Sequence, residues 1–161
     1  MNKKLFIFVL IYVGTIVLAN FTTSRLGLVP IGFGLMVTAG TFFAGLTPVV
    51  RDAIQLHGRW IVVPAAIVVG AVLSAITSNP AIALASGIAF LFSEIVDWGV
   101  FTPIRDRSLW TAVVVSSVVS APVDTILFLY LSGLGLSVPA VIGQFIVKTV
   151  IALALCKIVK R

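Results

Sequence analysis

The residues best suited to chemistry are ionisable side chains inside otherwise apolar stretches. Glu94 and Asp97 lie three residues apart in the largely apolar segment Ala81–Phe101, and Asp124 and Lys148 interrupt two later apolar segments. A charged group near the middle of a bilayer costs about 2.5 to 3.5 kcal/mol, so such groups face the interior of a helix bundle and find partners there. Carboxylates accept hydrogen bonds and an ammonium group donates them. The set therefore predicts a buried site that binds a polar solute.

The depth of each group follows from a helical rise of about 1.5 Å per residue. Counted from the outer ends of their segments, Glu94 lies near the middle of the bilayer and Asp97 closer to the cytoplasm, while Asp124 and Lys148 lie in the outer half. Neutral polar residues at compatible depth and one aromatic residue, suited to stacking or packing, complete the set. The predicted substrate-binding residues are Asn20, Glu94, Asp97, Trp98, Asp124, Gln144 and Lys148.

A purely structural interpretation stays open for some of these residues. Asp124 and Lys148 could form an ion pair that fixes helix packing, with Gln144 satisfying it. Asp97 precedes Arg105 by eight residues, so it could reach the inner interface or pair with cytoplasmic arginines. Because intramembrane ionisable residues are functional by default, a binding site is the main hypothesis.

A polar stretch after the second apolar segment includes Arg51, Asp52 and Gln55. Its composition is typical of a solvated cytoplasmic loop, and the alternative is that these three residues form a cytoplasmic gate. His57 follows without a second ligand at matching spacing, so we expect no metal site. A single cysteine excludes an internal disulfide. No cofactor motif and no nucleophile–base set are visible, so we expect no cofactor and no enzymatic activity.

The elements that position these residues must span a membrane. The chain has 161 residues, 60% hydrophobic and 10% charged, whereas soluble domains carry about 25% charged residues. Apolar windows near 20 residues match what a helix needs to cross a hydrocarbon core of about 30 Å. We therefore predict an all-α integral membrane protein, a six-helix bundle that forms one transmembrane domain over residues 1–161. The predicted helices span about 5–24, 29–50, 60–77, 81–104, 109–131 and 138–158.

The basic residues predict the orientation. Alternate connections put nine of the eleven Lys and Arg residues on one side, Arg25 on the other side and Lys148 within the membrane. Lys and Arg concentrate in cytoplasmic loops, so both termini are predicted to be cytoplasmic in a multi-pass protein of the inner (plasma) membrane. The net charge of +6 then reflects topology, and no nucleic acid partner is expected. The first apolar segment resembles a signal peptide, but its length favours retention.

Four segments resemble the VUT proteins, a family of vitamin uptake transporters whose studied members import queuosine precursors. The segments cover most of the chain in the expected order. The first is the least typical, because many members have an acidic residue and Tyr-Gly where this chain has Gln55 and His57-Gly58. The four segments are Thr47–Arg59 (TPVVRDAIQLHGR), Ala85–Asp97 (ASGIAFLFSEIVD), Val123–Phe128 (VDTILF) and Gly143–Lys148 (GQFIVK).

The resemblance implies a six-helix bundle related in architecture to the substrate-binding subunits of energy-coupling factor importers. It also implies the cargo, 7-cyano-7-deazaguanine or its aminomethyl relative. A guanine-like edge offers adjacent N–H and NH₂ donors that one carboxylate accepts together, and an exocyclic oxygen that needs a donor. An aromatic side chain can stack on the ring. Candidate acceptors are Glu94, Asp97 and Asp124, candidate donors are Lys148, Gln144 and Asn20, and candidate stacking residues are Trp98 and Phe128.

Three functions fit these observations. The first is an importer that binds the deazapurine in an intramembrane polar pocket and works alone or as a homo-oligomer. The second is a substrate-capture subunit of an energy-coupling factor importer, which transports only with a separate coupler and ATPases. The third is a small structural or pore-forming membrane protein, which would leave the four intramembrane charges without a purpose.

Overall fold

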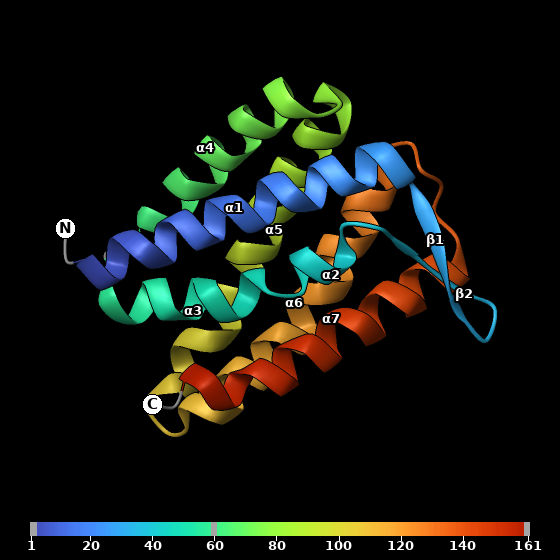
Figure 1. The fold of residues 1–161 in the computed structure, drawn as a ribbon. Helices are drawn as coiled ribbons and strands as arrows, with labels where there is room; N and C mark the ends of the chain where they lie inside the picture. Colours follow the sequence, from blue (N-terminus) through green and yellow to red (C-terminus); the bar gives the residue numbers. More distant parts are fainter. Residues whose placement is uncertain (1–2, 59–60, 160–161) are drawn as a thin grey trace.

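The computed structural model describes residues 3–58 and 61–159. Within these ranges the chain forms seven helices and one two-stranded hairpin (Figure 1). Arg59 and the first residue of the predicted window 60–77 lie outside the described residues. The elements are α1 (Lys3–Leu26), β1 (Leu28–Gly32), β2 (Leu35–Thr38), α2 (Thr41–Ala44), α3 (Thr47–His57), α4 (Val62–Thr77), α5 (Pro80–Arg105), α6 (Leu109–Leu131) and α7 (Val138–Val159).

The long helices are those of a membrane protein. Within the described residues, α1, α5, α6 and α7 are long and apolar enough to cross a membrane, and α4 is a shorter apolar helix of 16 residues. Large apolar side chains such as Ile76, Leu84 and Val150 are exposed on the outside of the bundle. A lipid-facing surface requires such side chains, and helices satisfy their backbone groups internally. The predicted class, an all-α membrane protein, is confirmed.

The predicted helix over 29–50 is wrong. The segment instead forms the β1–β2 hairpin, the single turn α2 and the start of α3. Gly27 ends α1 with a φ of 61°, and the hairpin turns through Gly32, Phe33 and Gly34, which also have positive φ. Glycine adopts this region readily, and a helix cannot continue through it. The average hydropathy of the window is high, and such an average does not register the residues that interrupt a helix. The other five predicted windows lie within two residues of α1, α4, α5, α6 and α7 at both ends.

The hairpin packs closely against α7 at the end of the bundle where α1 finishes (Figure 1). Its strands are antiparallel, with Leu28 opposite Thr38 and Pro30 opposite Met36. A Cβ added to Gly143 of α7 would lie only 2.2 Å from the Met36 carbonyl oxygen. Glycine at this position therefore lets the hairpin backbone touch α7.

Helix starts determine which residues of α5 and α6 face inward. The Asn79 side chain caps α5 by accepting a hydrogen bond from the Ala81 N–H at 2.8 Å, and Pro80 occupies the first helical position, where its missing N–H costs least. The Ser108 side chain caps α6 by accepting from the Thr111 N–H at 3.3 Å. The two helices pack against each other along their length, so the inward polar residues of one face those of the other.

The main apolar core lies where α1 packs against α3, α4 and α5. Its largest buried members include Tyr12, Ile16, Ile54, Ile67 and Phe90. The opposite side of α5, which faces α6, is different because buried serines and acids gather there. The bundle is therefore divided into an apolar half and a polar half, and the polar half contains the candidate site.

Candidate functional site

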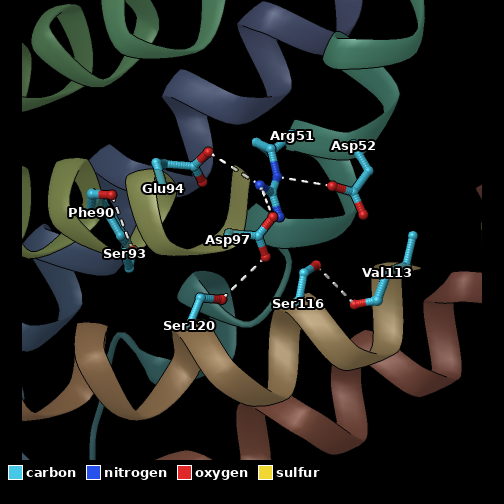
Figure 2. A network of polar contacts seen from close by, with 9 residues as sticks. All are labelled: Arg51, Asp52, Phe90, Ser93, Glu94, Asp97, Val113, Ser116 and Ser120. Carbon is cyan, nitrogen blue, oxygen red and sulfur yellow. Dashed lines mark hydrogen bonds and ion pairs between the residues drawn. The ribbon is translucent and has the colours of Figure 1, made fainter. Parts of the chain in front are cut away.

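One guanidinium contacts three carboxylates between α3 and α5. Arg51 Nη1 donates hydrogen bonds to Asp97 Oδ2 and, at 3.3 Å, to Glu94 Oε2 (Figure 2). Residues three apart share one helix face, so α5 directs both acids at the same guanidinium. Arg51 Nε lies 2.9 Å from Asp52 Oδ1. We call Arg51, Asp52, Glu94 and Asp97 the arginine cluster.

Asp97 is the best-satisfied acid of the arginine cluster. Its Oδ2 accepts from Arg51, and its Oδ1 accepts from the Ser120 Oγ of α6 at 3.2 Å. The residue is 1% exposed. Hydrogen bonds from a charged donor are about twice as strong as those between neutral groups, so Asp97 ties α3, α5 and α6 together.

Asp52 is the least satisfied acid of the cluster. It is fully buried, its Oδ1 is close enough to Arg51 for an ion pair but not aligned as a hydrogen bond, and its Oδ2 has no hydrogen-bond partner. An unsatisfied buried polar atom costs about 1 to 3 kcal/mol, and a charged one costs more. One cation thus faces three acids, one of which is only partly compensated.

Asp124 and Lys148 form a second buried ion pair. Lys148 Nζ on α7 lies 2.5 Å from Asp124 Oδ2 on α6 and donates to Thr125 Oγ1 at 2.9 Å. Asp124 is 8% exposed and Lys148 is 5% exposed. Removing one partner of a buried pair leaves an uncompensated charge, which costs about 3 to 5 kcal/mol. Each of the two residues therefore depends on the other to be stable in its buried position.

Two cavities lie in the polar half of the bundle. The arginine-side cavity is partly open, and its lining includes Arg51, Glu94, Ser120 and Thr149. The hairpin-side cavity is also partly open. Its lining comes from α1, β2, α2, α5, α6 and α7 and includes Asn20, Thr38, Ser86, Phe128 and Gln144.

The Asp124–Lys148 pair stands in the wall between these cavities. Asp124, Lys148 and Phe90 line both of them. Lys148 lies near the middle of α7, with the hairpin packed toward one end of that helix. The pair therefore separates the two cavities at about half the height of the bundle.

The two neutral polar residues of the hairpin-side cavity differ in their partners. Asn20 Nδ2 donates to Ser74 Oγ of α4 at 3.0 Å. Gln144 is 1% exposed, and its Nε2 has no hydrogen-bond partner. Buried amide donors normally find an acceptor, so Gln144 is suited to an acceptor atom of a bound solute. Gln144 lies one turn from Lys148 on the same face of α7.

The structure brings five of the seven predicted binding residues to the cavities. Asp97 instead lies behind Glu94 and contacts Arg51 and Ser120. Trp98 requires a correction, because it is 55% exposed on the outside of the bundle. It follows Asp97 by one residue, which turns it by about 100° around the helix and away from the site. The five that line the cavities are Asn20, Glu94, Asp124, Gln144 and Lys148.

Arg51 and Asp52 require a second correction, because the sequence favours a solvated cytoplasmic loop for them. They lie on α3 and are 1% and 0% exposed, while Gln55, one turn further, is half-buried. The Arg51 side chain can be buried because Glu94 and Asp97 of α5 compensate the charge of its guanidinium. Asp97 pairs with an arginine, as one alternative held, and that arginine is Arg51 of α3. A gating role for these residues stays a prediction.

Sequence reasoning missed three residues that help to build the site. Ser120 donates to Asp97, Thr125 accepts from Lys148, and the Phe90 ring lines both cavities. Helical spacing was the available signal, because Phe90 precedes Glu94 by four residues and Ser120 precedes Asp124 by four residues. Residues four apart lie on the same face of a helix.

The arrangement can bind a polar solute, because it places a carboxylate and cationic and amide donors beside buried cavities. In the part of the chain that the structure describes, no group of three or more His, Cys, Asp or Glu side chains is arranged to hold a metal ion. The polar side chains that line the cavities offer hydrogen bonding and ion pairing, and the rings of Phe90 and Phe128 offer stacking.

Comparison with protein-family models gives a match over residues 5–160, almost the whole chain. No curated protein and no solved structure matches the chain. The matched range includes every residue that lines the two cavities, and a transporter family of this kind acts on small molecules in a membrane. The chain therefore belongs to the family described as "Putative vitamin uptake transporter".

Proposed function

We propose that the protein imports a queuosine precursor, 7-cyano-7-deazaguanine or 7-aminomethyl-7-deazaguanine, across the inner (plasma) membrane. Membership of a vitamin-type uptake family supports a small-molecule cargo. The resemblance of Ala85–Asp97 and Gly143–Lys148 to VUT proteins that import queuosine precursors supports this particular cargo.

The position of the Asp124–Lys148 pair carries the proposal. A carboxylate and an ammonium group 2.5 Å apart lie in the wall that both cavities share. Burying two charges in the middle of an apolar bundle is expensive unless they are needed. A solute with a donor edge and an acceptor atom can bind between Asp124 and Lys148. When the direct contact between the two side chains breaks, the solute's donors pair with Asp124 and its acceptor pairs with Lys148.

The edge of a 7-deazaguanine is complementary to this pair. Its ring N–H and amino donors lie side by side, and one carboxylate accepts both. Asp124 is the acceptor because it borders both cavities, whereas Glu94 borders one and is held by Arg51. Lys148 and the free Nε2 of Gln144 are the donors to the exocyclic oxygen.

Two aromatic rings provide the stacking surface. Phe90 lines both cavities, and Phe128 lines the hairpin-side cavity. Stacking of a base on an aromatic side chain contributes about 1 to 3 kcal/mol. Trp98 lies outside this surface, so Phe128 remains of the two predicted stacking residues, and Phe90 joins it.

Import requires that the cavities open to opposite sides. With both termini in the cytoplasm, as the distribution of Lys and Arg indicates, the hairpin-side cavity faces outward and the arginine-side cavity faces the cytoplasm. The solute then enters beneath the hairpin and leaves past α3. Arg51, Asp52 and Gln55 on α3 lie on the exit path, which is where a cytoplasmic gate would act.

Uptake of radiolabelled 7-cyano-7-deazaguanine into liposomes that contain only this chain tests the proposal. We expect uptake by the wild type and strong loss of it in Asp124→Asn and Lys148→Met. Asp106→Asn and Arg107→Gln are matched controls, because both residues are exposed, and they should transport normally. Full uptake by both core variants would contradict the site.

The same experiment separates the alternative functions. Uptake that appears only after a coupler and ATPases are added would make the chain a capture subunit of an energy-coupling factor importer. Leakage of unrelated solutes of similar size at the same rate would make it a pore. Either result would contradict an importer that works alone.

A further inference from the structure

The bundle buries more acids than bases. Four of the five carboxylates in the chain are in the arginine cluster or in the Asp124–Lys148 pair, and the fifth, Asp106, has an 85% exposed side chain. Among the residues that the structure describes, two cations, Arg51 and Lys148, form ion pairs with those four acids. If all four were ionised, the core would carry two uncompensated negative charges, which a membrane interior disfavours.

The ion pairs do not spread this excess of negative charge evenly over the four acids. Lys148 compensates Asp124, so that pair is neutral by itself. Arg51 makes its closest contact with Asp97, whose second oxygen is satisfied by Ser120. Asp52 and Glu94 make the other two ion pairs of the Arg51 guanidinium, whose single positive charge cannot neutralise all three acids.

We propose that Glu94, in the lining of the arginine-side cavity, binds a proton and that this proton is the ion that drives transport. The inference rests on the proposed function, since it concerns how uptake of the solute gains energy. In the proton-binding step, a hydronium ion that enters from the outer side gives its proton to a Glu94 carboxylate oxygen and becomes water. In the reverse step, Glu94 releases the proton to water in the arginine-side cavity once that cavity is open to the cytoplasm.

Glu94 is the acid of the cluster that can exchange a proton with water. Its side chain is 18% exposed and lines the arginine-side cavity. The side chains of Asp52 and Asp97 are 1% and 2% exposed, and neither lines that cavity. Asp52 Oδ2 is a buried oxygen without a hydrogen-bond partner, so the cluster already holds more negative charge than Arg51 satisfies. A proton on Glu94 removes part of that excess.

The groups around Glu94 favour a proton over a metal cation. The Arg51 guanidinium lies 3.3 Å from Glu94 Oε2, and its positive charge repels a second cation at that point. In residues 3–58 and 61–159, no three potential metal-binding side chains are suitably grouped. The titratable and charged groups that act on Glu94 are Tyr12 of α1, Arg51 and Asp52 of α3, Asp97 of α5, Asp124 of α6 and Lys148 of α7. α4, which also packs on α5, has no titratable side chain.

The shared cavity links this proton to the solute. Glu94, Asp124 and Lys148 all line the arginine-side cavity. When Glu94 is ionised, its negative charge acts on Asp124 and Lys148 across the cavity that the three residues line. When Glu94 is protonated, Lys148 and Asp124 face the solute alone, so protonation of Glu94 should strengthen binding of the solute. Because the two binding equilibria are linked, binding of the solute must in turn favour the protonated form of Glu94.

Infrared difference spectroscopy on the purified full chain in lipid vesicles tests the inference without any substrate. We expect the wild type and the exposed-site control Asp106→Asn to show a carboxylic acid C=O band whose intensity changes with pH. Glu94→Gln should lose the pH-dependent part of that band. If the pH-dependent part persists in Glu94→Gln, or if the wild type has none, the inference is wrong. A band that responds to sodium at constant pH would also overturn it, because the site would then bind a metal cation.

Transport assays separate this inference from the proposed function. Glu94→Gln should still exchange labelled for unlabelled 7-cyano-7-deazaguanine at equal concentrations, but it should no longer accumulate the compound when an inward proton gradient is applied. Accumulation equal to that of the wild type would overturn the role of Glu94. If the wild type itself moves no deazaguanine, the proposed substrate fails, while the infrared result still decides whether Glu94 binds the proton.

Discussion

Asp124 on α6 and Lys148 on α7 are 24 residues apart in sequence, yet their charged atoms lie 2.5 Å apart in the wall that two cavities share. Besides this shared pair, each cavity has a polar residue that the other cavity lacks. The arginine side has Glu94, and the hairpin side has Gln144. The pair is thus the point at which a solute in either cavity meets the same two charges.

Arg51 should be the most important residue for stability among the buried charges. Replacing it by Met removes the cation that three carboxylates share. Breaking a buried pair costs about 3 to 5 kcal/mol. Thermal unfolding in detergent should therefore occur at a clearly lower temperature in Arg51→Met, whereas Arg107→Met, on the exposed surface, should unfold like the wild type.

The double variant Arg51→Met/Asp97→Asn should recover part of that loss, because it removes one of the stranded negative charges. Thermal unfolding of the two single variants and the double variant forms a double-mutant cycle. Purely additive effects would contradict the direct contact between Arg51 and Asp97.

Gln144 and Asn20 should respond to leucine substitution in opposite ways. Gln144 Nε2 has no hydrogen-bond partner, so Gln144→Leu should leave the melting temperature unchanged or raise it while the affinity for the deazaguanine falls. Asn20 donates to Ser74, so Asn20→Leu strands a buried hydroxyl and should destabilise the protein by about 1 to 3 kcal/mol. Thermal unfolding and binding of labelled compound measure the two effects. Equal destabilisation by both substitutions would show that Gln144 has a partner within the protein.

Trp98 should not contribute to transport. It is 55% exposed on the outer surface of α5, away from both cavity linings. Trp98→Phe should therefore leave the rate of uptake within about twofold of wild type, since surface changes are usually within 0.5 kcal/mol. In contrast, Phe90→Leu removes the ring that lines both cavities and should weaken binding by about 1 to 3 kcal/mol. A loss in Trp98→Phe as large as that in Phe90→Leu would contradict this placement of the stacking surface.

The long helices could be predicted from sequence because their signal is one-dimensional. A window of about twenty mostly apolar residues predicts a helix whatever it packs against, and α5 and α7 end within one residue of the predicted bounds. The window over 29–50 had the same apolar composition but contained Gly32, Phe33 and Gly34. Their positive φ angles break a helix, and a hydropathy average does not register them.

The site could be predicted in part, because a charge inside an apolar window is visible without knowing its partner. Asp124 and Lys148 were identified as a potential pair for this reason. The burial of Arg51 could not be predicted, because it depends on α3 folding back into the bundle to reach Asp97, 46 residues further along the chain. The outward position of Trp98 depends on the rotation of α5, which the start of a helix in sequence fixes only to within a few residues.

Calorimetric binding of 7-cyano-7-deazaguanine to the charge-swapped variant Asp124→Lys/Lys148→Asp tests the central claim most directly. The swap restores an ion pair between α6 and α7, so it should recover the melting temperature that each single change lowers. If the pair binds the solute, the swapped variant should be folded and yet show at least about a tenfold loss of affinity, since a charge-assisted hydrogen bond contributes about 1.5 to 3 kcal/mol. Wild-type affinity in a folded swapped variant would contradict the account, because the pair would then serve only to hold α6 and α7 together.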